Sequence, residues 1–174
     1  QRDLNTAEAR NIAIPTFNYL FAPPSSRSAP FTDRWMCKLH REMFCNVWKW
    51  PGQLRTQSVN LGVPFQQIST RLYDLTETVK FWRTSGDMPI IEQCVRLHHQ
   101  PVVIHPFPNG NGRWARLLSN ILLRQAGRGY VAWPDNDILQ ESNPLRQRYI
   151  QALKAADAGS LAALQELHDE YLTR

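Results

Sequence analysis

Apolar residues recur along most of this chain at the three- and four-residue spacing of an amphipathic helix, and alternation of β-branched residues is scarce. This spacing places the apolar side chains on one face of a helix and favours a helical architecture over a sheet. The 174 residues are 43% hydrophobic and include six tryptophans, enough for one domain with a substantial core. We therefore expect a mainly α fold.

Proline, glycine and capping residues divide this helical pattern into segments. A short first helix over about residues 4–14 should end at Pro15, and residues 21–30, with Pro23-Pro24 and three serines, should form a loop. Thr32 is a candidate N-cap for the second helix. Further helices are expected over about residues 64–79, 89–97, 110–126, 144–158 and 160–172. In the helix over 110–126 the expected core face is Leu117, Leu118, Ile121 and Leu122.

One internal segment, residues 55–63, breaks the helical pattern. It is polar, contains Thr56, Val59 and Gly62, and has no apolar stripe. Such a segment is typical of a small β-hairpin or an extended flap. The expected architecture is a helical bundle that carries one small β-hairpin.

Composition excludes several classes of protein. The sequence has no apolar run of about 18 residues and no apolar leader, so neither a membrane span nor a secretory signal is expected. Cys37, Cys45 and Cys94 fit no metal spacing, which favours a reduced, cytoplasmic protein. The net charge is +5, but no Lys/Arg cluster stands out, so nucleic acid is not the expected partner.

The stretch from His105 to Arg116, HPFPNGNGRWAR, combines three features that suit a phosphate. His105 can take a proton near neutral pH. Small residues at a helix start let backbone N–H groups approach an anion. Arg113 and Arg116, three residues apart, share one helix face and have forked donors. This stretch therefore predicts an anion-binding catalytic loop.

The other histidines (His40, His98, His99 and His168) are expected to be structural, and no metal cluster is expected around His98, Gln100 and His105.

The same stretch resembles the Fic (Fic/Doc) family pattern H-x-F-x-[D/E]-G-N-G-R-x-x-R. The matching positions are His105, Phe107, Gly110, Asn111, Gly112, Arg113 and Arg116. Residues 39–52 and 55–63 are similar to the family's helix before its flap and to the flap itself. The likeness covers about residues 33–157, and HPFPNGNGR is most similar to the Fic-type "mobile mystery protein B" group.

The resemblance implies a Fic-type helical bundle whose β-hairpin flap lies next to the active-site loop. It also implies transfer of AMP from ATP to a Ser, Thr or Tyr hydroxyl of a target protein, with release of pyrophosphate. His105 would be the general base. Phosphates would be held by Gly110, Asn111 and Gly112 through backbone N–H groups and the Asn111 side chain, and by Arg113 and Arg116. Phe107 would be a packing anchor.

Asn109 departs from the family pattern, which has a carboxylate at this position to bind Mg²⁺. An amide oxygen is a weaker ligand for a hard cation. The resemblance therefore implies ATP and Mg²⁺, with Asn109 as a weak metal ligand and activity reduced or changed.

Two regions outside the loop also acquire expected roles. The target protein would add a strand along the flap, whose residues are Thr56, Gln57, Ser58, Val59, Asn60, Leu61, Gly62 and Val63. The segment Thr6-Ala7-Glu8-Ala9-Arg10-Asn11 resembles the family's inhibitory motif [S/T]-x-x-x-E-[G/N], except that Arg10 replaces Glu. It is either a degenerate inhibitory segment, in which Glu8 pairs with the loop instead, or a chance similarity.

These expectations divide the chain into residues 1–32 (N-terminal helix and loop), 33–157 (Fic domain) and 158–174 (C-terminal helix packed on it). Two alternatives stay open. The enzyme could transfer another phosphate-linked group, such as UMP, phosphocholine or a phosphoryl group. Alternatively, the chain could be a catalytically weak nucleotide-binding or interaction module of a toxin–antitoxin-like pair with a small helix-turn-helix partner.

Overall fold

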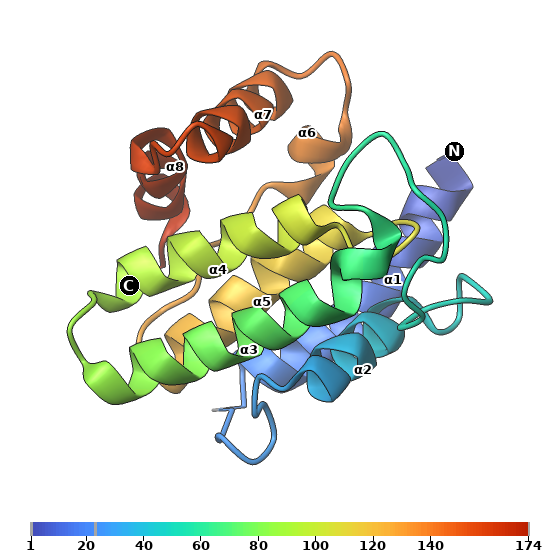
Figure 1. Ribbon diagram of the computed structural model, residues 1–174. Coiled ribbons are helices and arrows are strands. Elements are labelled where there is room, and N and C mark those ends of the chain that lie inside the picture. The colour runs from blue at the N-terminus through green and yellow to red at the C-terminus, as the bar shows by residue number, and fades with distance from the viewer. Residues whose placement is uncertain (1, 23, 174) are drawn as a thin grey trace.

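Helices form nearly all of the regular secondary structure of this protein. The computed structural model describes residues 2–22 and 24–173. Its elements are α1 (Arg2–Leu20), α2 (Asp33–Phe44), η1 (Phe65–Gln67), α3 (Ile68–Ser85), α4 (Ile90–Ile104), α5 (Asn111–Gln125), α6 (Asp135–Leu139), α7 (Pro144–Asp157) and α8 (Ala162–Tyr171). The mainly helical prediction is confirmed (Figure 1).

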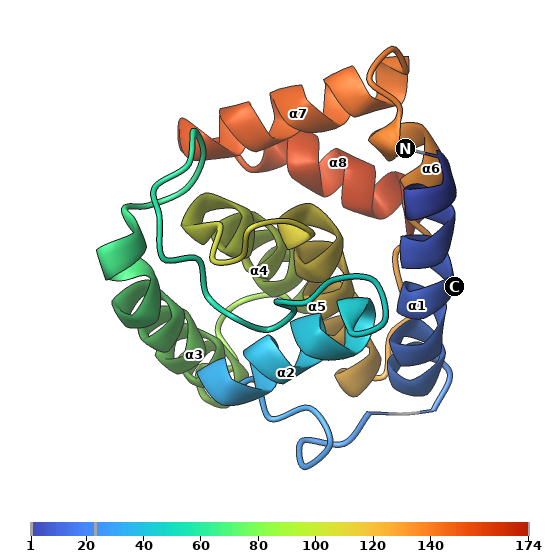
Figure 2. The same ribbon diagram turned by 90° about the vertical axis from the view of Figure 1, so that its right-hand side faces the viewer.

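Two helices, α4 and α5, form the centre of the bundle. Figure 2 looks along them, and the other helices form a ring around them. The core face predicted for α5 is buried: Leu117, Leu118, Ile121 and Leu122 are each at most 5% exposed. Trp114, at the start of α5, is fully buried and donates a hydrogen bond to the carbonyl of Met36 in α2, 3.0 Å away. Packing of α5 therefore fixes where its N-terminus lies.

Local signals in the sequence account for several helix ends. The Thr32 hydroxyl accepts a hydrogen bond from the Trp35 N–H at 3.2 Å, so the predicted N-cap of α2 is confirmed. Asn143 caps α7 in the same way. Gly86 ends α3 with φ of 69°, a conformation that favours glycine.

The predicted end of the first helix at Pro15 is wrong. Helix α1 continues to Leu20, with Pro15 inside it. Proline removes one hydrogen bond of the helix, but one face of α1 is buried against α2 and α5, and that packing outweighs the loss. Glu8, Asn11, Pro15 and Tyr19 lie on this buried face.

The predicted β-hairpin is also wrong. Within residues 2–22 and 24–173 the only β pairing is an isolated antiparallel bridge between Val131 and Leu172. Residues 53–63 form an irregular loop whose backbone is held by the Arg55 side chain. A short α6, which the sequence pattern did not predict, precedes α7; five residues are too few to show a helical period.

The two ends of the chain pack on the central pair. Helix α1 contacts α2 and α5, and α8 contacts α7 and α4. No helix among the described residues combines the length and the apolar character that a membrane crossing requires.

Candidate active site

The predicted anion-binding loop joins the end of α4 to the start of α5. His105 ends α4 in a left-handed conformation, with φ of 50°, which is uncommon for a residue other than glycine. Gly110 precedes α5 with φ of 80°, and a Cβ there would lie 2.5 Å from the Phe44 ring. The turn therefore requires a glycine at 110 for both conformation and space.

Buried hydrogen bonds hold this loop in one shape. The Asn111 side chain accepts from the Phe107 N–H at 3.0 Å and donates to the Phe107 carbonyl at 2.8 Å. Phe107 is fully buried, as expected of a packing anchor. Asn111 was expected to direct its side chain at the phosphates, but here that side chain is 2% exposed and both its polar atoms bind the loop backbone. Asn111 thus stabilises the loop.

His40 in α2 packs against the same loop and bonds to its backbone. Its ring stacks on Phe107 at a centroid distance of 3.7 Å. The Gly52 N–H donates to Nδ1 at 2.9 Å, so Nε2 carries the proton and donates to the Asn109 carbonyl at 3.0 Å. Burial lowers the pKa of His40 to about 4, which keeps the ring neutral. The sequence predicted a structural role for His40, and the part of the structure that His40 stabilises is the loop from His105 to Gly110.

His105 stands at the edge of a cavity of about 440 Å³. The cavity is lined by His105, Pro108 and the flap residues Ser58, Val59, Asn60 and Leu61. Burial lowers the pKa of His105, the positive charge of Arg55 lowers it further, and the backbone of Val102 acts in the opposite direction. A neutral imidazole beside an open cavity can accept a proton near pH 7.

Arg55 connects the flap to the histidine and was missed as a functional residue. Its Nε donates to the His105 carbonyl at 2.7 Å, and its other nitrogens donate to the carbonyls of Gln57 and Val63. The Arg55 N–H also donates to the Pro106 carbonyl at 2.9 Å. Flap carbonyls that a hairpin would pair with each other are thus satisfied by one buried guanidinium. This accounts for the absence of a β ladder in the described flap.

The start of α5 presents unpaired backbone donors. Asn111, Gly112 and Arg113 are its first three residues, and the first intrahelical bond runs from the Trp114 N–H to the Gly110 carbonyl at 3.0 Å. The N–H groups before this bond and the helix dipole together favour an anion.

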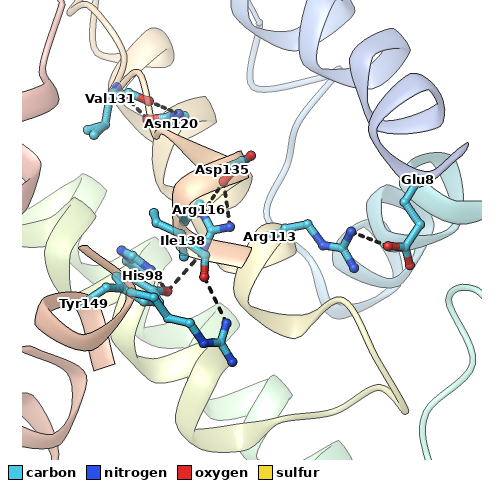
Figure 3. A network of polar contacts seen from close by, with 10 residues as sticks. Glu8, His98, Arg113, Arg116, Asn120, Val131, Asp135, Ile138 and Tyr149 are labelled. Carbon is cyan, nitrogen blue, oxygen red and sulfur yellow. Dashed lines mark hydrogen bonds and ion pairs between the residues drawn. The ribbon is translucent and has the colours of Figure 1, made fainter. Parts of the chain in front are cut away.

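Arg113 is occupied by a carboxylate from α1. Its Nη1 donates to Glu8 Oε2 at 2.6 Å (Figure 3). Trp48 Nε1 donates to the other carboxylate oxygen at 2.9 Å. The side chains of Arg113 and Glu8 are 9% and 4% exposed. Glu8 therefore meets the loop at the first arginine of the motif, whereas the inhibitory motif implied the second.

The other polar residues of the segment from Thr6 to Asn11, which resembles the inhibitory motif, have surroundings different from those of Glu8. Asn11 is buried and bonds to Asn46, whose amide donates to it at 2.8 Å. Thr6 and Arg10 line a groove of about 770 Å³ between α1 and α6, together with Arg113 and Asp135.

Arg116 is enclosed by residues of α6 and α7. Its guanidinium contacts Asp135 of α6 at 2.6 Å and donates to the Tyr149 hydroxyl at 3.3 Å (Figure 3). It also lies over the rings of Trp133 and Tyr149, 6.0 Å and 5.4 Å from their centroids. A smaller crevice of about 160 Å³ is lined by both loop arginines. Asp135, Trp133 and Tyr149 have no short motif that would have revealed them in the sequence.

The described residues contain no group of three His, Cys, Asp or Glu side chains that could hold a metal ion. The Asn109 amide oxygen accepts the Gly110 N–H at 2.7 Å, so it caps the turn. A neutral, already bonded oxygen fits Mg²⁺ poorly, since Mg²⁺ in nucleotide sites is usually held by one or two carboxylates.

This arrangement of a histidine loop before a buried helix belongs to a known family. Residues 30–123, more than half of the chain, match the model of the Fic/DOC family, and the chain is a member of that family.

Relatives and solved structures are similar over most of the chain. A probable protein adenylyltransferase of Aquifex aeolicus (strain VF5) is 29% identical over 128 residues, 70% of this chain and 37% of that protein. Protein adenylyltransferase Fic of Drosophila grimshawi is 41% identical over 113 residues, 63% of this chain and 22% of that protein. The chain thus spans well under half of the length of these relatives.

The fold is shared with a Fic domain-containing signaling protein from Bacteroides thetaiotaomicron. The TM-score is 0.75 at 18% identity, over 94% of this chain and 66% of that one. BepC of Bartonella tribocorum with bound AMPPNP has a TM-score of 0.72 at 18% identity, over 99% of this chain and 87% of that one.

Proposed function

We propose that this domain transfers AMP from ATP to a hydroxyl side chain of a target protein. The observation that carries the proposal is the loop 105–110, which is held by the hydrogen bonds of Asn111 and His40 and joins a neutral histidine to the N-terminus of α5. Membership of the Fic/DOC family, relatives named protein adenylyltransferases, and a structural neighbour with bound AMPPNP support it.

In this reaction His105 takes the proton of the target Ser, Thr or Tyr hydroxyl. The hydroxyl oxygen attacks the α-phosphorus of ATP, the bond to the β-phosphate breaks, and pyrophosphate leaves. The target segment lies along the flap from Thr56 to Val63, where the cavity beside His105 opens. Exposed Val59 and Leu61 offer apolar contacts for that segment.

The phosphates bind at the N-terminus of α5, where the N–H groups and the two arginines meet developing negative charge. In the structure Arg113 is paired with Glu8 and Arg116 with Asp135. Phosphates must therefore displace one or both carboxylates, so the described state is a resting state with low affinity for nucleotide.

Mg²⁺ would have to enter with the nucleotide, because Asn109 offers only one neutral oxygen. Membership of the "mobile mystery protein B" group, a helix-turn-helix partner and a cytoplasmic location stay predictions from the sequence. Transfer of a phosphoryl group and a catalytically weak binding module are the alternatives that labelled ATP separates, whereas transfer of UMP or phosphocholine requires the same test with the corresponding labelled donor.

The deciding experiment uses ATP labelled at either the α- or the γ-phosphate. The protein and its His105→Ala variant are incubated with each label, Mg²⁺ or Mn²⁺, and cell extract. We expect α-label on a protein band that disappears with His105→Ala, because only adenylyl transfer retains the α-phosphate.

Other outcomes identify the alternatives. Label transferred only from the γ-position would contradict adenylylation and indicate phosphorylation. Absence of any label, with ATP binding retained, would indicate the binding module.

A further inference from the structure

A chain of buried polar side chains runs from Arg116 away from the proposed phosphate site. The Tyr149 hydroxyl in α7 lies 3.3 Å from Arg116 Nη1 and 2.8 Å from His98 Nε2 in α4 (Figure 3). His98 Nδ1 lies 2.9 Å from His168 Nε2 in α8. All four residues are at most 6% exposed, so water does not satisfy their polar atoms.

We propose that Tyr149 is a positioning residue for Arg116, and that His98 and His168 fix its hydroxyl through a one-way chain of hydrogen bonds. The role in phosphate binding rests on the proposed function. The direction of the chain follows from the side chains alone.

The direction is set by the arginine, which can only donate. Since Arg116 donates to the Tyr149 oxygen, the hydroxyl proton is available for His98 Nε2, which must accept. A neutral His98 then carries its proton on Nδ1 and donates to His168 Nε2. His168 carries its own proton on Nδ1, which is buried without a partner among the described residues.

The opposite direction leaves more groups unsatisfied. If His98 donated from Nε2, the Tyr149 oxygen would accept twice and its own buried proton would have no acceptor. His168 Nδ1 would then be an unpaired acceptor as well. A second unsatisfied buried group is costly, so the chain from arginine to histidine is preferred.

Both histidines are neutral in this arrangement. Burial lowers the pKa of His98 well below its ordinary value, with His168 and Arg116 adding to the effect. Burial alone lowers the pKa of His168 to about 3. Trp133 packs edge-on against both rings, at 5.1 Å and 5.0 Å, and excludes water from them.

This hydrogen-bond chain matters for Arg116 because a bound phosphate would compete with Asp135, the other partner of Arg116. The Asp135 side chain is 47% exposed and lies on the five-residue α6. When a phosphate replaces that carboxylate, Tyr149 still holds the guanidinium against the buried side of the site. Arg116 then reorients little on binding, which favours affinity.

The test compares Tyr149→Phe with Tyr19→Phe. Each variant removes the hydroxyl of a buried tyrosine that makes a hydrogen bond. Tyr19 serves as the control because its hydroxyl bonds to Glu42 and not to Arg116. We expect Tyr149→Phe to weaken ATP binding roughly tenfold, because Arg116 and His98 each lose a partner, and Tyr19→Phe to leave it within about twofold. Where AMP transfer is measurable, KM for ATP should rise with kcat little changed.

A second readout needs no activity. In ¹⁵N-histidine NMR of the wild type at neutral pH, His98 and His168 should both be neutral with the proton on Nδ1. In Tyr149→Phe, the His98 signals should shift and exchange of the Arg116 Nε proton should accelerate. These signals decide the proposal even if the protein transfers no AMP.

Two results would overturn the proposal. A proton on Nε2 of His98 in the wild type would show that the hydrogen bonds run in the opposite direction, from His168 to Tyr149. Unchanged Arg116 exchange and unchanged ATP affinity in Tyr149→Phe would show that Tyr149 only fills space.

Discussion

Residues of one type do different work in this protein because their surroundings differ. His105 faces an open cavity and is placed to move a proton, whereas His40 is buried and uses both ring nitrogens to hold the loop backbone. Asn111 was expected at the phosphates but bonds to Phe107, and Asn109 caps the turn. The arginines also differ, since Arg55 holds the flap and Arg113 meets Glu8.

Asn109→Asp should raise the rate of AMP transfer. A carboxylate at this exposed position can still accept the Gly110 N–H and adds the negative charge that Mg²⁺ prefers. We expect an increase of about tenfold in kcat/KM for ATP at limiting Mg²⁺, measured against the wild type, with the difference smaller at saturating Mg²⁺. A rate that stays equal or falls would show that the amide is no handicap.

Among the elements, α1 differs most from expectation. Its buried face carries it through Pro15, and the same face brings Glu8 to the start of α5. Removing the whole segment would take Tyr19 away from Trp35 and uncover the faces of α2 and α5 on which α1 packs. A point substitution is therefore the better test of inhibition by α1.

Glu8→Gln should make nucleotide binding tighter while making the fold less stable. The amide oxygen can still accept from Trp48, but the charge that competes with phosphate for Arg113 is lost. We expect ATP affinity to rise on the order of tenfold and the free energy of unfolding to fall by about 3 kcal/mol. Calorimetric titration and urea denaturation measure the two effects.

The matched control for this variant is Glu92→Gln, which removes an exposed ion pair with Arg96 on α4. It should change neither quantity appreciably. If Glu8→Gln left ATP affinity unchanged or weaker, Glu8 would be a structural partner of Arg113 and not an inhibitor.

The molecule as a whole buries three neutral histidines, one under the loop and two between α4, α7 and α8. Burial lowers the pKa of His40 to about 4 and that of His168 to about 3, and it lowers the pKa of His98 well below its ordinary value. In the unfolded chain each titrates near 6.5. Around and below that pH the unfolded state therefore binds more protons than the folded state, so the free energy of unfolding decreases as the pH is lowered.

We expect the free energy of unfolding to fall by roughly 4 kcal/mol between pH 7 and pH 5.5, since each histidine contributes about 1.3 kcal/mol. Urea denaturation across this range measures the change. His168→Gln keeps an acceptor for His98. It should lower the number of protons taken up on unfolding, which the slope of the unfolding free energy against pH measures, by about one. A stability that is independent of pH in this interval would contradict the buried, neutral state of these rings.

The sequence alone determined the helical architecture, the Thr32 cap, the core face of α5 and the loop from His105 to Arg116. Each of these depends on residues that are close in the chain, so spacing and residue type suffice to predict them. Tertiary structure decided what the arginines of the site contact. Glu8 reaches Arg113 across 105 positions, and Tyr149 and Asp135 reach Arg116 from α7 and α6. It also replaced the hairpin by a loop around Arg55 and carried α1 past Pro15, because packing between distant segments outweighs local preference.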